Sequence, residues 1–383
     1  MKRRLVILTE IISPYRIPLF YALAQHASVD LYVIFLAETD PNLRQWRVYK
    51  EEINFPYQIL PSWRKRLHGY NVLLNRGVAR ALSAASPDVV LCGGYSYVAS
   101  WRALYWTRSH NIPFLLWSES NLQDLRRGHL LVESLKTGFL RKCDGFIVPG
   151  RSALEYLRAY KITEDVIFTA PNAVDNDLFA RAAATARRDA SACRRELCLP
   201  DRYFLFVGRL VRDKGVFDLL SAYAKLDTRT RQQVGVVFVG DGASRAQLEE
   251  QAASISPGVV KFAGFAQREQ LARYYALAQI LVLPTYTDPW GLVVNEAMAC
   301  GLPVILSRAA GCASDLVKEN WNGLVVPPRD ITSLSSAMMY LVTQPDLCVT
   351  MGSHSERHIS QYSPKEWANA TAGAVRAMVG AGD

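Results

Sequence analysis

Short apolar runs alternate with amphipathic stretches along the whole chain, a pattern typical of parallel sheets built from strand–helix–strand units. Strands buried on both faces are expected to be continuous runs of Val, Ile, Leu and Phe. In the first half the pattern predicts strands over residues 4–9, 30–36, 89–92, 113–117, 145–149 and 167–170. In the second half it predicts strands over residues 204–207, 236–239, 260–262, 280–283, 303–306 and 323–326.

Helical periodicity fills the segments between these strands. The predicted helices cover residues 18–26, 76–85, 216–225, 245–253, 267–276, 295–299 and 331–342. A last helical segment, about 364–383, follows the final strand, and we expect it to pack back on the first half. The chain is therefore predicted to be an α/β protein with two doubly wound, Rossmann-like sheets. Such sheets bind ligands at the carboxyl ends of their strands.

The length of 383 residues suffices for two domains, each with its own core. We predict an N-terminal domain over residues 1–183, completed by the C-terminal helix, and a C-terminal domain over residues 184–363. No apolar run reaches about eighteen residues, so no transmembrane helix is predicted. Glu10 ends the first apolar run early, which favours a buried strand over a signal peptide. The seven cysteines form no CxxC pair, which favours a reducing cytoplasm.

The net charge of +9 is concentrated in the first half. Residues 1–183 contain 23 Lys+Arg and 16 Asp+Glu, whereas residues 184–383 contain 21 and 19. The segment from Trp63 to Leu67, with Trp46 and Tyr70 nearby, has two interpretations. It rests on an anionic membrane surface with its aromatic rings at the headgroups, or it is a solvated basic loop. No nucleic acid is expected, because no nucleic-acid-binding motif accompanies the charge.

Two carboxylates, Asp288 and Glu296, flank a glycine turn at Gly291 and the start of a small-residue helix. The free N–H groups and positive end of such a helix attract phosphate. A carboxylate accepts hydrogen bonds from sugar hydroxyls. The segment therefore fits a phosphorylated, polyhydroxylated ligand, although an ordinary buried helix with two incidental acids has the same residues.

Two cations follow the predicted strand 204–207. Arg209 and Lys214 lie between two glycines, and a diphosphate needs paired cations, of which arginine can bind in a bidentate manner. Two further turns follow neighbouring strands. One is the glycine turn of residues 239–242, which alone is weak evidence. The other is Gly264-Phe265. Either its backbone faces a planar base of a ligand, or it is an ordinary apolar turn.

The first half offers two strand-end loops. In the first, Tyr15 and Arg16 lie between two prolines, and they either contact a phosphate of a substrate or form the start of a helix, with Pro18 near its first position. In the second, Glu119 follows strand 113–117 and is a candidate for contact with a substrate hydroxyl or for a base-like role. A helix N-cap formed by Ser120 or Asn121 is the alternative interpretation of that loop.

No metal site is predicted. His354 and His358 lie four residues apart but lack a third ligand, so we expect them on a solvated helix face.

Residues 200–345 resemble the nucleotide-binding domain of the retaining GT-B-fold glycosyltransferases of family four, the glycosyl transferases group 1. The resemblance rests on the motifs at 208–215, 239–242, 264–271 and 288–296, and on the closing Asn-Gly-Leu-Val-Val-Pro at 322–327. Residues 170–175 resemble the family's Pro-Asn-Gly-Val-Asp. The resemblance implies a GT-B fold, in which two Rossmann-like domains face each other across a cleft.

The resemblance also implies roles for individual residues. Arg209 and Lys214 would neutralise the donor diphosphate, and Glu296 would accept the ribose hydroxyls. Asp288 would hold hydroxyls of the transferred sugar. The amides around Trp290, Gly291 and Leu292 would contact sugar and phosphate. The family most often has Glu at position 288, and many relatives have a His-Asp pair where this chain has the polar segment 118–121.

The implied activity is transfer of a hexosyl group, with retention, from a UDP- or GDP-sugar to a lipid-linked or glycan acceptor in cell-envelope or exopolysaccharide synthesis. The resemblance implies no metal or other cofactor. The location expected is the cytoplasm, peripheral on the inner face of the membrane. The alternatives are a GT-B-fold epimerase or phosphorylase and a non-catalytic nucleotide-sugar-binding protein. A dinucleotide-dependent oxidoreductase is disfavoured, because the chain has no Gly-x-Gly-x-x-Gly run.

Overall fold

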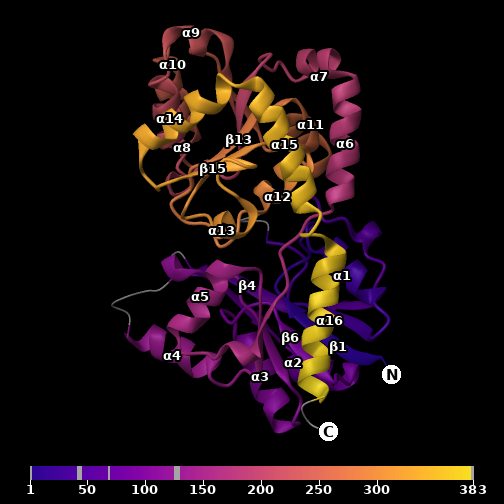
Figure 1. Ribbon diagram of the computed structural model, residues 1–383. Helices are drawn as coiled ribbons and strands as arrows, with labels where there is room; N and C mark the ends of the chain where they lie inside the picture. The colour runs from indigo at the N-terminus through magenta and orange to yellow at the C-terminus, as the bar shows by residue number, and fades with distance from the viewer. Residues whose placement is uncertain (1, 41–44, 68–69, 125–129, 381–383) are drawn as a thin grey trace. The chain divides into compact units, whose positions relative to one another are not determined.

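The computed structural model describes residues 2–40, 45–67, 70–124 and 130–380. The chain forms two compact units (Figure 1). Unit 1 comprises Met1–Val174 and Ser363–Asp383, and unit 2 comprises Asp175–Tyr362. Sequence analysis places the boundary after residue 183, whereas α6 (Asn176–Arg188) packs against helices α11 and α12 of unit 2. The end of the predicted C-terminal helix, residues 381–383, lies outside the described residues.

Unit 1 is built on a seven-stranded parallel sheet, and its six predicted strands are confirmed. The strand order is β3-β2-β1-β6-β7-β8-β9. The strand bounds are β1 (Arg3–Thr9), β2 (Val29–Phe35), β3 (Tyr57–Ile59), β6 (Val89–Cys92), β7 (Phe114–Trp117), β8 (Gly145–Val148) and β9 (Ile167–Thr169). The short β3 was not predicted, because three residues are too few for an alternation pattern.

Helices cover both faces of this sheet. They are α1 (Ile17–Ala24), α2 (Val78–Ala85), α3 (Val98–Ser109), α4 (Leu130–Leu140), α5 (Arg151–Ala159) and α16 (Pro364–Gly380), with short 3₁₀ helices η1 (Lys50–Glu52), η2 (Leu122–Asp124) and η3 (Glu164–Val166). The C-terminal α16 lies beside α1 (Figure 1). Its Trp367 is fully buried, with ring centroids 5.0 Å from Trp117 and 6.1 Å from Phe20. The last helix of the chain therefore completes the core of unit 1.

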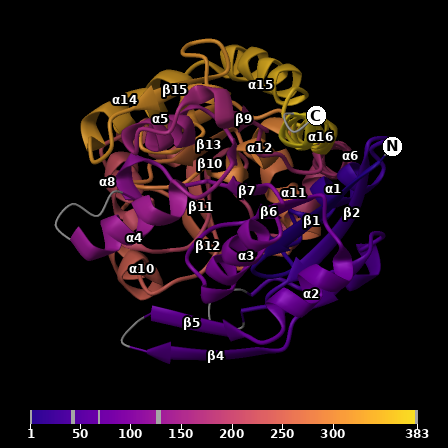
Figure 2. The same ribbon diagram turned by 90° about the horizontal axis from the view of Figure 1, so that it is seen from below.

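The basic segment around Trp63 is a β-hairpin. Strands β4 (Ser62–Leu67) and β5 (Tyr70–Asn75) pair in antiparallel register and form a sheet of their own (Figure 2). The interpretation of this segment as a solvated loop is therefore wrong. Three consecutive cations, Arg64 to Arg66, obscured the strand in the sequence, because they leave no alternation of apolar and polar positions.

Unit 2 is built on a six-stranded parallel sheet with the order β12-β11-β10-β13-β14-β15, and all six strands were predicted. The strands are β10 (Tyr203–Val207), β11 (Gly235–Val239), β12 (Val260–Gly264), β13 (Ile280–Leu283), β14 (Val304–Ser307) and β15 (Gly323–Val326). The remaining helices are α7 (Ala190–Glu196), η4 (Arg212–Lys214), α8 (Val216–Ala224), α9 (Thr228–Gln233), α10 (Arg245–Ala253), α11 (Arg268–Leu277), α12 (Leu292–Ala299), α13 (Ala313–Leu316), α14 (Ile331–Val342) and α15 (Pro345–Ile359).

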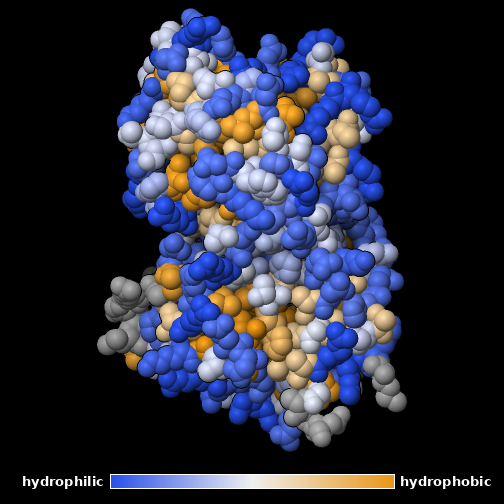
Figure 3. All heavy atoms as spheres, viewed as in Figure 1, coloured by the Kyte–Doolittle hydropathy of each residue, from blue (hydrophilic) through white to orange (hydrophobic). Residues whose placement is uncertain are grey.

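The surface is mostly hydrophilic on the face shown in Figure 3, with apolar patches between charged side chains. Among the described residues, none of the helices combines the length and apolar character that crossing a membrane requires.

Replacing Trp367 tests the contribution of α16 to unit 1. Trp367→Ala removes a fully buried indole, so the free energy of unfolding should fall by about 3–5 kcal/mol. Denaturant titration followed by circular dichroism measures this change. The control is Arg376→Ala, an exposed position on the same helix, which should alter stability by less than about 0.5 kcal/mol. A small effect of Trp367→Ala would show that α16 contributes little to this core.

Candidate functional site

Two loops at the carboxyl edge of the unit 2 sheet are joined by backbone contacts. The carbonyl of Asp213, after β10, accepts bonds from the Tyr286 amide at 2.8 Å and the Thr285 hydroxyl at 3.0 Å, both after β13. Gly215 has φ +68°, and a Cβ there would lie 2.0 Å from the carbonyl oxygen of Pro284. Only glycine allows this approach, so the glycine of the Lys-Gly motif fixes where Lys214 lies.

This junction brings together two residues that the sequence analysis singled out. Lys214 Nζ lies 2.5 Å from Asp288 Oδ2, and the two side chains are only 15% and 16% exposed. The other carboxylate oxygen of Asp288 accepts a bond from the Trp290 amide at 3.3 Å. A cation and a carboxylate are thus positioned together at the edge where nucleotide ligands of such sheets bind.

The segment before α12 is attached to the loop after β14. The Gly311 amide donates to the Asp288 carbonyl at 2.9 Å, and the Cys312 amide donates to the Trp290 carbonyl at 3.0 Å. A Cβ at Gly311 would lie 2.0 Å from the carbonyl oxygen of Pro289, so the two backbones are in direct contact. The backbone path that leads into the helix N-terminus is therefore fixed on both sides.

The indole of Trp290 belongs to the core. It is buried, and its Nε1 donates to Oδ1 of the buried Asn295 at 2.9 Å. Gly291 precedes α12, and Leu292 is the first residue of that helix and half-buried. Any contact that Trp290 makes with a ligand at this helix start would therefore use its backbone.

Glu296 lies on α12, and the pKa of its carboxyl group is raised. Burial raises the pKa of Glu296 to about 7, and the hydrogen bond that Tyr275 donates to its Oε2 at 2.7 Å partly opposes that rise. Tyr275 of α11 is itself buried and packs edge-on against Phe179. Sequence analysis missed Tyr275, because only the packing of α11 beside α12 shows which carboxylate its hydroxyl meets.

The other predicted donor residues lie on the neighbouring strand ends. Arg209 follows β10 and is exposed, and Phe265 follows β12 and is exposed. The carbonyl of Gly264, the last residue of β12, accepts a bond from the Gly240 amide at 2.7 Å. The structure thus brings Lys214 and Asp288 into contact, whereas Arg209 and Phe265 are directed to solvent.

In unit 1, Arg16 lies at the ends of β1 and β7. Its Nη1 donates to the Thr9 hydroxyl at 2.8 Å, and its guanidinium carbon lies 4.4 Å from the ring centroid of Trp117. Its Nη2 lies 3.3 Å from Glu119 Oε2. Burial disfavours the charge on Arg16, but the nearby Glu119, Tyr15 and Glu10 outweigh it and raise the pKa of this guanidinium. Arg16 is therefore a fixed cation.

Both carboxylate oxygens of Glu119 are engaged. Oε2 pairs with Arg16, and Oε1 accepts a bond from Asn172 Nδ2 at 3.0 Å. In the same loop, Asn121 Oδ1 accepts a bond from the Gln123 amide at 3.0 Å, at the start of η2. Tyr15 packs edge-on against Trp46, with ring centroids 5.9 Å apart. Glu119, Asn172 and Arg16 thus form one network, which their separation in the sequence does not predict.

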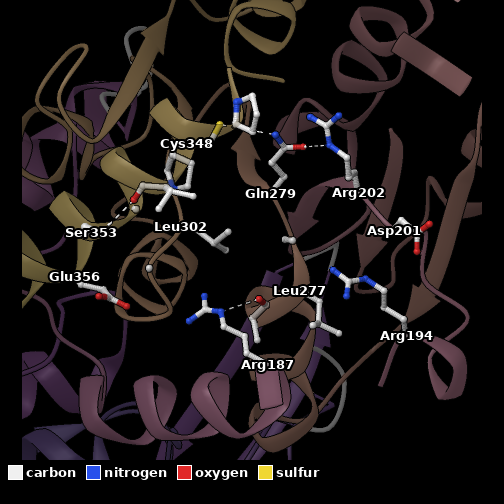
Figure 4. Close-up of a pocket in the computed structure, with 17 residues that line it drawn as sticks. Arg187, Arg194, Asp201, Arg202, Leu277, Gln279, Leu302, Cys348, Ser353 and Glu356 are labelled. Carbon is white, nitrogen blue, oxygen red and sulfur yellow. Dashed lines mark hydrogen bonds between the residues drawn. The ribbon is translucent and has the colours of Figure 1, made fainter. Parts of the chain in front are cut away.

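A pocket of about 450 Å³ lies at the opposite, amino-terminal edge of the unit 2 strands (Figure 4). Arg187 Nε donates to the Ala276 carbonyl at 3.1 Å, and its Nη2 donates to the Cys300 carbonyl. Arg202 Nη2 donates to the Val342 carbonyl at 2.6 Å. These guanidiniums bond carbonyls at the ends of α11, α12 and α14, which is a stabilising role at helix C-termini.

The two histidines of α15 are not solvated as predicted. His358 is buried with Nε2 3.0 Å from the Asp315 carbonyl, and His354 Nδ1 lies 2.7 Å from the Trp321 carbonyl. The Trp321 ring stacks on His354 and meets His358 edge-on, so both belong to an aromatic cluster. Across the described part of the chain, no three His, Cys, Asp or Glu side chains are grouped as metal ligands.

Two family models match the chain. The model of the Glycosyl transferases group 1 matches residues 195–358, and that of Glycosyltransferase Family 4 matches residues 21–178. Similar proteins include two D-inositol 3-phosphate glycosyltransferases. The one of Corynebacterium jeikeium is 34% identical over 55% of this chain and 51% of its own length, and that of Streptomyces bingchenggensis is 32% identical over 48% and 42%. The chain thus spans about half the length of the curated relatives it matches.

Solved structures share the fold over nearly the whole chain. A sucrose-phosphate synthase from Thermosynechococcus elongatus has a TM-score of 0.73 at 23% identity and covers 99% of this chain and 100% of its own. Anabaena Alr3699/HepE, solved with UDP and glucose, has a TM-score of 0.75 at 18% identity, with 98% and 100% covered. Together with the two sheets and the matched family models, these similarities show that the chain belongs to the group 1 glycosyltransferases of family four and has their GT-B fold.

Proposed function

We propose that this protein transfers a hexosyl group from a UDP- or GDP-sugar to a lipid-linked or glycan acceptor, with retention at the anomeric carbon. The observation that carries the proposal is the contact between Lys214 and Asp288 beside the start of α12. In this proposal Lys214 would bind the diphosphate and Asp288 would bind sugar hydroxyls, and their contact holds the two side chains together. One structural relative, Anabaena Alr3699/HepE, was solved with UDP and glucose and with UDP-glucose, which supports a nucleotide-sugar donor.

The donor is assigned to the carboxyl edge of the unit 2 sheet. Lys214 and the exposed Arg209 would bind the diphosphate, and backbone amides near Gly291 and Leu292 would add hydrogen bonds at the helix start. Glu296 would accept the ribose hydroxyls, and Gly264-Phe265 would lie against the base. When phosphate occupies Lys214, the Asp288 carboxylate loses part of its counter-charge and becomes a better acceptor for sugar hydroxyls.

The chemistry requires stabilisation of the departing phosphate charge. Cations positioned at the phosphate supply it, and we assign this role to Lys214, which Asp288 holds in place, and to the exposed Arg209, without a metal or other cofactor. Retention would follow from attack on the same face of the sugar, assisted by the leaving phosphate. Asp288 has one methylene less than the glutamate usual in the family, so its reach selects among donor sugars.

The acceptor is assigned to unit 1. Arg16, fixed by Thr9, Glu119 and the Trp117 ring, offers a cation to a phosphate of the acceptor or donor. Glu119 then acts through Arg16 as a positioning residue, because both of its oxygens already accept bonds. A lipid-linked acceptor would place the protein at the cytoplasmic membrane face, in cell-envelope or exopolysaccharide synthesis.

A donor panel tests the assignment. UDP- and GDP-sugars are incubated with the purified protein, and nucleoside diphosphate release and sugar transfer are followed by mass spectrometry. Replacing Arg209 and Lys214 together by alanine should lower the rate with the preferred donor by at least about hundredfold. The control is Arg229→Ala, an exposed arginine of α9. Unchanged activity of the double variant would refute the site, and donor binding without turnover would indicate a binding protein.

The raised pKa of Glu296 predicts that donor affinity depends on pH. With a pKa of about 7, its carboxylate is ionised above pH 7 and becomes protonated as the pH falls. The donor KM should therefore rise below about pH 7, since the protonated acid is a poorer acceptor for two ribose hydroxyls. Glu296→Gln should raise the KM and make it independent of pH between roughly 5.5 and 8, a range that brackets the pKa of Glu296. A wild-type KM that stays constant over that range would contradict this role.

Glu119→Gln distinguishes positioning from base catalysis. If Glu119 only orients Arg16, the neutral amide keeps a hydrogen bond, so the rate should fall about tenfold and the pH profile should keep its shape. If Glu119 were the base, the rate should fall about 10²–10⁴-fold and the acidic limb should disappear. Steady-state kinetics over a pH series measures both quantities. The companion variant Asn172→Ala, which leaves the Arg16 contact intact, should change the rate less than Glu119→Gln.

A further inference from the structure

The hairpin of β4 and β5 has two unlike faces. Cross-strand partners share a face, and successive partners alternate between faces. Trp63 lies opposite Leu74 and Lys65 lies opposite Val72, so these four share one face. Arg64 and Leu73 form the pair on the other face. The side chains of residues 66–71, which include Tyr70, lie outside the described ones.

The Arg64 face is attached to the body of unit 1. Arg64 pairs with the carboxylate of the buried Asp40, and a further contact joins it to Glu10 at 3.7 Å. Leu73 is buried in the core, and Asn75 Nδ2 donates to the Leu36 carbonyl at 2.6 Å. These contacts fix the orientation of the hairpin, so the opposite face is directed outward.

The outward face of the hairpin is apolar and basic, and α3 lies beside it. Trp63 is 52% exposed, Leu74 is 41% exposed, and Lys65 is exposed. On α3, the exposed side chains of Val98, Arg102 and Tyr105 follow one another at helical spacing, which places them on one stripe. Arg102 Nη1 donates to the Asn75 carbonyl at 2.9 Å and so connects the helix to the end of β5. We call these side chains together the hairpin–α3 surface.

The charge of this region is one-sided. Residues 61–118, which contain the hairpin, α2 and α3, have seven Lys+Arg and one acidic residue, Asp88. The Asp88 carboxylate accepts a bond from the Arg4 amide at 2.7 Å, at the start of β1. The positive charge is therefore not neutralised within the segment, and it accounts for much of the surplus of the first half of the chain.

We infer that the hairpin–α3 surface docks on an anionic lipid bilayer. Trp and Tyr are suited to the headgroup region, where one edge of the ring is apolar and the other is wet. Exposed Leu and Val add apolar area, and each Lys or Arg near an anionic bilayer contributes further attraction. Single exposed apolar side chains are common, but here Trp63 and Leu74 share one hairpin face with Lys65, and the adjoining α3 adds exposed Val98, Arg102 and Tyr105.

This inference deepens the proposed function, on which its biological use rests, because a lipid-linked acceptor lies in the same bilayer. It also revises the membrane hypothesis that the sequence suggested. Arg64 is occupied by Asp40 and Glu10, and Trp46 packs against Tyr15. Neither belongs to the lipid-facing set, whereas Leu74 and Tyr105, which sequence analysis did not single out, do.

Vesicle co-sedimentation of the full chain tests the inference. Phosphatidylcholine vesicles are compared with vesicles that also contain phosphatidylglycerol, at low and high salt. The wild-type protein should bind the anionic vesicles and be released by salt. Replacing Trp63 and Leu74 by serine should lower the partition coefficient at least about tenfold, because both substitutions remove apolar area from the contact with the bilayer. Lys65→Gln should lower it about fivefold on anionic vesicles only.

The controls separate docking from folding and from catalysis. Tyr340→Ser with Val349→Ser removes an exposed aromatic and an exposed aliphatic side chain of unit 2 and should leave the partition unchanged. Thermal unfolding of the Trp63→Ser, Leu74→Ser variant should match that of the wild type, and its hydrolysis of a nucleotide-sugar in the absence of vesicles should be retained.

Equal binding of this variant and the wild type to vesicles, or no binding by the wild type, would overturn the inference. Self-association abolished by the same substitutions, without vesicle binding, would assign the surface to a second copy instead. Failure of donor turnover with intact vesicle binding would refute the proposed function alone.

Discussion

The carbonyl of Asp213 is the point on which the unit 2 site depends. It accepts bonds from the Tyr286 amide and the Thr285 hydroxyl, and these bonds hold the loop after β10 against the loop after β13. Because the approach of Gly215 to Pro284 is too close for a side chain, the register of the two loops is fixed. The Lys214–Asp288 contact follows from this register, and it places opposite charges together in a partly buried position. The geometry of the site is thus set by backbone contacts rather than by its charges.

Much of the fold could be predicted because parallel strands covered on both faces are apolar throughout. All strands of the unit 2 sheet, and six of the seven in unit 1, coincide with predicted runs. The candidate residues of unit 2 could be found for a related reason. Each follows a strand directly, and strand ends of one parallel sheet lie along one edge, so position in the sequence gives position in space.

What could not be predicted depends on partners far away in the sequence. The β4 strand has a polar sequence that does not predict a strand. The carboxylates that neutralise its Arg64 belong to Glu10 and Asp40, which lie far away in the sequence. From the sequence, Glu119 is a candidate for a free base, but in the structure Arg16 and Asn172 occupy its two carboxylate oxygens. His358 has the spacing of a solvated helix face until its burial beside Trp321 is known. In each case the local sequence identifies the chemical groups of the residue, but it does not identify the hydrogen-bond or packing partners that the fold provides.

The return of α16 to unit 1 has a consequence for biosynthesis. During translation unit 2 leaves the ribosome as one uninterrupted segment, whereas the core of unit 1 lacks Trp367 until all of unit 2 has been made. Domains usually fold as units in the order of synthesis, but here the first unit to begin is the last to be complete. Until then the aromatic side chains of Phe20 and Trp117 lack the indole that packs on them, and apolar surface exposed in this way during folding favours aggregation.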